Sequence, residues 1–331
     1  MDLVHLWLGL VGLVVILYVI LDGFSLGVAI LFPGAKSEEE RSVMMNSIAP
    51  VWDCNQTWIV FGGAALFATF PMIYTVLFSA LYIPLLTFLF GLIFRGVAFE
   101  FRENAKKKTV WNRAFFWGSL AAAFAQGLTL GAYISGIEVK NGIFAGGAFD
   151  WLNSFAVLVG LAVPAGYMLL GSTYLIIKTD GAVHDRACRQ AWWSALIVAG
   201  FMIIVSIWTP LHDPQIPARW FSEPRIYFVW AFPLLGITAF VLLLIGLKKK
   251  RVSMPFFASV LLFVSAYLGL QTAIYPYAIL PDVTIYAAVA QRESLIFMLW
   301  GVSIILPVVL AYVIYSYWVF RGKVTAEEAY H

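Results

Sequence analysis

The sequence predicts an all-α polytopic membrane protein with nine transmembrane helices, organised as a single integral-membrane domain over residues 1–331. Hydrophobic residues make up 62% of the chain and charged residues 12%, about half of the charged share of soluble proteins. The mean hydropathy is +0.88. A surface so poor in charge must face membrane lipid, and nine spans of about 25 residues leave about ten residues for each connection.

The predicted spans are long apolar runs, and each one predicts a helix because backbone groups in hydrocarbon must be paired within their own segment. None of the runs alternates as the strands of a membrane barrel do. The first run follows no basic segment and precedes no small-residue cleavage site, so we expect it to be retained. In chain order the spans are 3–32, 43–70, 73–99, 112–136, 152–177, 190–209, 227–247, 254–275 and 294–320.

The connections between these spans differ in charge. Fifteen Lys and Arg residues lie in the loops after the first, third, fifth and seventh spans and in the C-terminal tail, against four on the opposite side. This bias predicts an N-terminus outside and a C-terminus in the cytoplasm. The net charge of +3 is too small to suggest nucleic acid as a partner. The longest outer loop, 210–226, holds four prolines and is either an interfacial cap or a plain connector.

Two acids stand inside the predicted spans, where a charge costs about 2.5 to 3.5 kcal/mol and therefore needs a reason. Asp22 lies about 15 Å from the inner end of the first span, and Asp53 in the second span is expected at the same depth, facing it. Desolvation favours their protonated forms, so the two could relay protons. The alternative is a structural pair of protonated acids, with polar neighbours as caps: Ser25, Trp52, Asn55, Gln56 and Trp58.

Other polar residues in the spans have simpler interpretations. Pro50 removes one backbone hydrogen bond and predicts a kink in the second span. At the inner end of the third span, Arg95 is expected to pair elsewhere or to reach the interface, whereas Glu100 belongs to a charged helix end. Gln126 is expected to join helices.

The chain lacks the residues that most cofactors need. None of its four histidines lies in the middle of a span, so a bis-His haem site is excluded, and no metal site is expected. Neither cysteine is in a CxxC pair, and the motifs of nucleotide binding and hydrolysis are absent. The sequence alone therefore contains no evident redox centre or nucleophile.

Five motifs, in this order, resemble subunit II of the cytochrome bd family of quinol oxidases, including its cyanide-insensitive branch. They are LDGFSLGVAIL at 21–31, NSIAPVWDCNQTWIVFGGAALFA at 46–68, FRGVAFEFR at 94–102, AQGLTLGAYI at 125–134 and YPYAILP at 275–281. Two positions depart from the family pattern. Ser25 replaces an acid of GFDLG, which removes one proton carrier, and Cys54 replaces the glycine of WDGN.

The resemblance implies two four-helix bundles plus one extra helix, in a bacterial cytoplasmic (inner) membrane. It implies a heterodimer with a subunit I that carries haems b and d, with small accessory subunits as further partners and quinol as the substrate of the complex. No cofactor is expected on this chain. Protons and oxygen would reach the partner in part through this subunit. Asp53 would be the proton-path acid and Asp22 its weaker companion, supported by Ser25, Trp52, Asn55, Gln56, Trp58, Arg95 and Glu100.

A second interpretation is a secondary transporter, with Asp22 and Asp53 beside Pro50 as an ion site at a broken helix. Such transporters usually have interrupted helices in both halves. The later spans of this chain carry no intramembrane charge, which favours a subunit whose polar half serves a partner.

Overall fold

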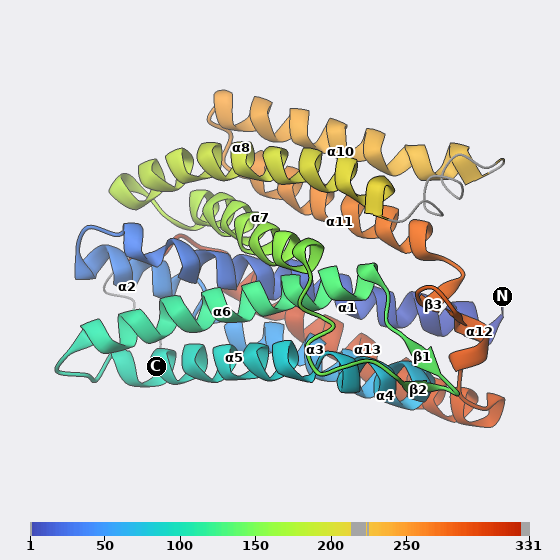
Figure 1. Cartoon of the computed structure of the whole chain (residues 1–331). Coiled ribbons are helices and arrows are strands. Elements are labelled where there is room, and N and C mark those ends of the chain that lie inside the picture. Colours follow the sequence, from blue (N-terminus) through green and yellow to red (C-terminus); the bar gives the residue numbers. More distant parts are fainter. Residues whose placement is uncertain (1, 213–222, 224, 326–331) are drawn as a thin grey trace.

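The structure, a computed structural model, describes residues 2–212, 223 and 225–325. Long α-helices lie side by side, and the first and last described residues, Asp2 and Thr325, lie toward opposite ends of the molecule (Figure 1). Within the described residues, eight helices are long and apolar enough to cross a membrane. The all-α membrane class is therefore confirmed. The tip of the predicted outer loop at 210–226 lies outside the described residues.

The helices follow the predicted spans closely except in the second and third. The bounds are α1 (Leu3–Leu31), η1 (Phe32–Gly34), α2 (Glu38–Asn46), α3 (Trp52–Thr69), α4 (Pro71–Ala80), α5 (Tyr82–Arg102), α6 (Lys108–Ser135), α7 (Ser154–Lys178), α8 (Gly181–His212), α10 (Arg225–Lys248), α11 (Met254–Ile274), α12 (Ile285–Ala288) and α13 (Arg292–Val319).

The second predicted span, 43–70, is two helices and not one kinked helix. Pro50 lies in the turn between α2 and α3, because its ring and missing N–H prevent the helix from continuing. The eighteen-residue α3 is not among the eight apolar spans, and Asp53, Asn55 and Gln56 occupy its first two turns. The third predicted span is interrupted as well, at Leu81, three residues before Pro84.

Two short hairpins close the end of the molecule at which α1 begins (Figure 1). Strands β1 (Val139–Lys140) and β2 (Ile143–Phe144) form one, and β3 (Tyr277–Ile279) and β4 (Val283–Thr284) form the other. The opposite end is called the basic end here, because the connections from α5 to α6, α7 to α8 and α10 to α11, together with the helix ends beside them, carry 11 of the 21 Lys and Arg residues.

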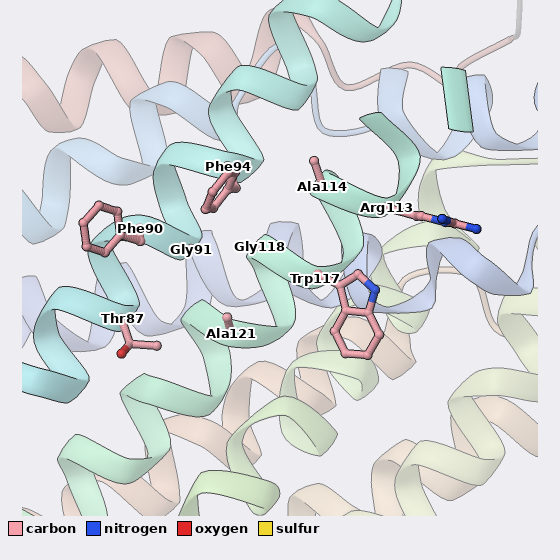
Figure 2. Close-up of a pocket in the computed structure, with 9 residues that line it drawn as sticks. All are labelled: Thr87, Phe90, Gly91, Phe94, Arg113, Ala114, Trp117, Gly118 and Ala121. Atoms are coloured by element: carbon pink, nitrogen blue, oxygen red, sulfur yellow. The ribbon is translucent and has the colours of Figure 1, made fainter. Parts of the chain in front are cut away.

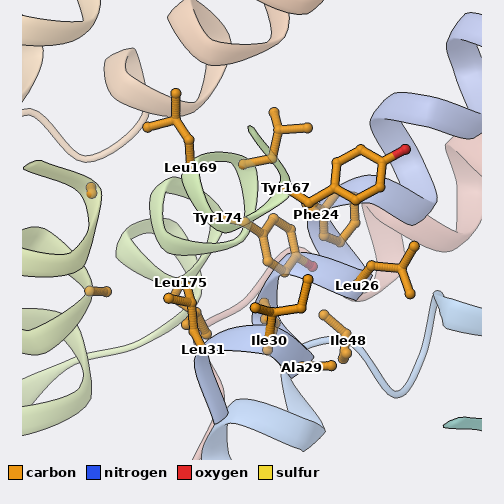
Figure 3. Close-up of a cluster of buried hydrophobic side chains, with 14 of the residues drawn as sticks. Phe24, Leu26, Ala29, Ile30, Leu31, Ile48, Tyr167, Leu169, Tyr174 and Leu175 are labelled. Atoms are coloured by element: carbon orange, nitrogen blue, oxygen red, sulfur yellow. The ribbon is translucent and has the colours of Figure 1, made fainter. Parts of the chain in front are cut away.

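The central contact of the fold is between α1 and α7, whose backbones touch. A Cβ on Gly27 would lie 1.7 Å from the carbonyl oxygen of Tyr167, and one on Gly171 would lie 2.4 Å from the nitrogen of Val28. Aromatic rings fill the space beside this contact, with Phe24 stacked on Tyr174 at 4.1 Å (Figure 3). Small residues at a helix crossing allow this close packing, which positions the polar residues of α1.

Candidate functional site

Asp22, in the middle of α1, is wholly buried and forms an ion pair. Nη2 of Arg95, on α5, donates to Oδ1 of Asp22 at 2.7 Å, and both side chains are 0% exposed. The hydroxyl of Tyr18, one turn earlier on α1, donates to Oδ2 at 3.0 Å. The carboxylate is thus held by a charge and by a hydrogen bond, which are what a buried charge needs.

The hydrogen bonds continue from Asp22 across the bundle. Nε2 of Gln126, on α6, donates to the Tyr18 hydroxyl at 3.1 Å, and the Tyr167 hydroxyl, on α7, donates to Oε1 of Gln126 at 2.5 Å. One chain of polar side chains therefore joins α1, α5, α6 and α7. Gln126 joins helices, as its sequence position predicts, and Tyr18 and Tyr167 are members that the sequence analysis missed.

A second polar group ties α3 to its neighbours through Asn55. Its Nδ2 donates to the carbonyl oxygen of Leu21 at 2.8 Å and to the Ser25 hydroxyl at 3.2 Å. Its Oδ1 accepts from the Tyr317 hydroxyl, on α13, at 2.8 Å. Asn55 and Ser25 thus hold α1, α3 and α13 together, and neither caps an acid.

Asp53 lies in the first turn of α3 and is exposed on the surface of the chain. It forms no ion pair with any residue in the described part of the structure. The preceding residue, Trp52, stacks on Phe99 of α5 at 4.8 Å, which fixes the start of α3 against α5. A carboxylate in the first turn is favoured by the unpaired N–H groups of the helix terminus. Asp53 therefore stands at the surface as an acid that a partner or water can reach.

Residues 3–320 match the family model described as "Cytochrome bd terminal oxidase subunit II". The chain belongs to this family.

Its relatives cover nearly the whole length of the chain. It is 28% identical to cytochrome bd-I ubiquinol oxidase subunit 2 of Escherichia coli K12, over 98% of this chain and 95% of the relative. It is 29% identical to cytochrome bd ubiquinol oxidase subunit 2 of Bacillus subtilis, over 98% and 97%. The bd oxidase structure from Geobacillus thermodenitrificans has the same fold, with a TM-score of 0.77 at 16% identity, over 96% of this chain and 97% of that one.

The sequence predicts that Asp22 and Asp53 face one another, but in this subunit II chain the two acids lie apart. Asp22 points into the bundle, whereas Asp53 lies on the exposed face of α3. Their depths differ as well. Trp52 stacks on Phe99 and Asp22 pairs with Arg95, so the acids lie about one turn of α5, roughly 5 Å, apart along its axis. Asp53 is the one nearer the basic end.

The other expected supporting residues are distributed between these two environments. Glu100 is exposed near the end of α5. Gln56 is half-buried and Trp58 is buried, and neither donates a hydrogen bond to an acid among the described residues. The buried donor atoms that lack an acceptor in the described structure include Nε2 of Gln56, Nε1 of Trp58, and Nε and Nη1 of Arg95.

A charged cluster at the basic end of this subunit II fold was also missed from the sequence. Glu40, on α2, accepts from both terminal nitrogens of Arg186, on α8, at 2.6 and 3.0 Å. Hydrogen bonds from Arg186 and then from the backbone of Lys36 lower the pKa of Glu40 to about 2. Glu38 accepts from Arg102 at 2.8 Å. The signal was the acidic start of α2, which the sequence analysis placed in a loop.

Proposed function

We propose that this chain is the haem-free subunit II of a bd-type quinol:oxygen oxidoreductase in a bacterial cytoplasmic membrane. The observation that carries the proposal is the family match over residues 3–320, together with relatives named as ubiquinol oxidase subunits. In this proposal a partner subunit I holds haems b and d and oxidises quinol. The present chain, as one integral-membrane unit, supports that partner and helps protons and oxygen to reach it.

The face that we assign to the partner is the one that carries Asp53. Thr57 and Val60 continue this exposed face along α3, and Val60 is 70% exposed. The neighbouring helix α13, whose Tyr317 bonds Asn55, presents large apolar side chains at this level, with Ile314 at 66% and Trp318 at 59% exposure. Exposing a carboxylate to lipid beside so much apolar surface would cost free energy. This supports a protein partner, and not lipid, at this face.

We assign Asp53 as the acid that takes up protons for the reduction of oxygen to water. It lies about 5 Å from the basic end of α5, measured from Phe99, so water on that side can reach it. With the N-terminus outside and the C-terminus in the cytoplasm, the basic end faces the cytoplasm. Proton uptake from there, with quinol protons released outside, makes the reaction electrogenic.

Asp22 is the weaker companion in this proposal. Its two oxygens are already engaged by Arg95 and Tyr18. Proton transfer through Asp22 would require that pair to open. The secondary transporter is the second candidate, and the family match favours the oxidase subunit over it.

Co-purification tests the proposal. The tagged chain, expressed in its native membrane and purified in mild detergent, is expected to retain a haem-bearing partner, seen in the visible spectrum of the eluate. A matched preparation of the chain expressed alone in a host without bd oxidase is expected to show no haem bands. Isolation from the native membrane without any haem protein would overturn the proposal.

A further inference from the structure

A groove on the outer surface, between α5 and α6, is not used by the proposed function. Its volume is about 520 Å³, and Thr87, Phe90, Gly91, Phe94, Arg113, Ala114, Trp117, Gly118 and Ala121 line it (Figure 2). The two helices touch at its floor, because a Cβ on Gly91 would lie 2.6 Å from the carbonyl oxygen of Gly118. Larger side chains on both sides of this crossing form the walls.

The walls are apolar and face outward. Phe90 is 56% exposed, Phe94 58% and Trp117 61%, so the rings stand up from the surface with the small residues between them. The groove runs from Arg113 to Ala121, a rise of about 12 Å along α6. This shape accepts a linear hydrocarbon chain lying along the helices.

A cation without a carboxylate partner stands at one end of the groove. Arg113 is exposed, and it forms no ion pair with any acid among the residues that the structure describes. It lies five residues into α6, about 7.5 Å from the helix start, and Lys106, Lys107 and Lys108 precede it. By contrast, Arg102 of the same region is buried and engaged by Glu38.

We propose that this groove binds an anionic phospholipid, with an acyl chain between α5 and α6 and the phosphate at Arg113. Charge complementarity selects this occupant, since a cation at headgroup depth above an apolar channel matches a lipid with a negative headgroup. Trp117, one turn deeper than Arg113, is of the residue type that anchors at the membrane interface. The site uses none of the residues assigned above to the proton path or to the partner face, and does not rest on the oxidase assignment.

A second groove in the same molecule serves as an internal comparison. It lies between α6, α7 and α8, has a volume of about 580 Å³, and has Gln190 as its one strongly polar lining side chain. The nearby Arg186 is held by Glu40. Because no Lys or Arg is among the described residues that line it, this groove is expected to take lipid chains without preference for headgroup charge.

Fluorescence quenching by brominated lipids tests the proposal. The full chain, with the partner that co-purifies with it, is placed in nanodiscs of phosphatidylcholine with a minor fraction of lipid brominated on its acyl chains. The brominated lipid is phosphatidylglycerol in one series and phosphatidylcholine in the other. Subtracting the signal of a Trp117→Phe variant isolates the quenching of Trp117.

We expect brominated phosphatidylglycerol to quench Trp117 at several-fold lower mole fraction than brominated phosphatidylcholine. Arg113→Gln should reduce this preference about five-fold, the effect of one basic residue at a membrane surface. The matched control Arg189→Gln removes an exposed charge at the same end that lines neither groove, and should leave the preference unchanged. Ala121→Phe, which fills the groove, should reduce quenching by both lipids.

Three results would overturn the proposal. Equal quenching by the two lipids would show that the groove does not select charge. Equal loss of preference in Arg113→Gln and Arg189→Gln would show that the general charge of the basic end is responsible. Absence of Trp117 quenching by either lipid, in a complex that retains its partner, would show that protein covers the groove.

Discussion

The buried ion pair between Asp22 and Arg95 gives the sharpest stability prediction. Replacing Arg95 by Met leaves a wholly buried carboxylate with only the Tyr18 hydroxyl as a donor. Breaking a buried pair from one side costs about 3–5 kcal/mol. Two nitrogens of Arg95 have no acceptor in the described structure, and their removal offsets part of this loss. We therefore expect Arg95→Met to destabilise the fold by about 3 kcal/mol.

The double variant Asp22→Asn/Arg95→Met distinguishes the loss of the ion pair from the cost of leaving one buried charge without its partner. Replacing both partners by neutral side chains of similar size is often close to neutral, so the double variant should be within about 1 kcal/mol of the wild type. Thermal unfolding in mild detergent, followed by fluorescence-detected size exclusion, measures Arg95→Met, Asp22→Asn and the double variant. Tyr18→Phe removes the hydroxyl that donates to Asp22 and accepts from Gln126, and is expected to destabilise the fold by about 1–3 kcal/mol. Additive losses in the double variant would refute the pairing.

Three further predictions concern packing and the basic end. Gly27→Ala should destabilise the fold by more than about 3 kcal/mol in thermal unfolding, because its Cβ would lie 1.7 Å from the backbone of α7. Gly9→Ala is the control, because a Cβ there meets open space, and it should be neutral or stabilising. The pKa of Glu40 is lowered to about 2, so the stability that its carboxylate contributes is complete above about pH 4.5 and is lost as the pH falls toward 2. Glu40→Gln should therefore reduce the decrease of the unfolding temperature between these two pH values. An unchanged decrease would refute the contact with Arg186. Lys178→Met removes a charged donor to the carbonyls of Phe320 and Gly322, which follow α13, and should destabilise the fold by about 1–3 kcal/mol. The variant should also be cleaved faster by protease after α13, and equal cleavage of both forms would contradict this.

Apolar run length predicts most of this fold because hydrocarbon requires internal backbone pairing. It fails where a proline breaks a run that hydropathy reads as continuous. Pro50 and Pro84 each mark such a break. The prediction from sequence was a kink at Pro50 and an unbroken helix at Pro84. The break at Pro50 moves Asp53 from the predicted middle of a helix to the first turn of α3.

The site was predicted in part, for a similar reason. The free-energy cost of a buried charge identifies Asp22 and Arg95 as unusual residues. It does not show that they form a pair, because pairing depends on how each helix is rotated about its axis, and the length of an apolar run carries no information about that rotation. Tyr18 lies one turn from Asp22 and could have been found from that spacing. Tyr167 and Tyr317 come from distant helices, so only the packing of α1 against α7 and α3 against α13 reveals them.

The most direct test of the central claim is quinol-driven oxygen consumption by the complex with Asp53→Asn. The account predicts a slower turnover with unchanged haem content and unchanged partner, and restoration of most of the rate by Asp53→Glu. Thr57→Val, on the same exposed face of α3, is the control for a surface change without loss of an acid. Wild-type turnover in Asp53→Asn, in a complex of normal haem content, would contradict the assignment of Asp53 to the proton path.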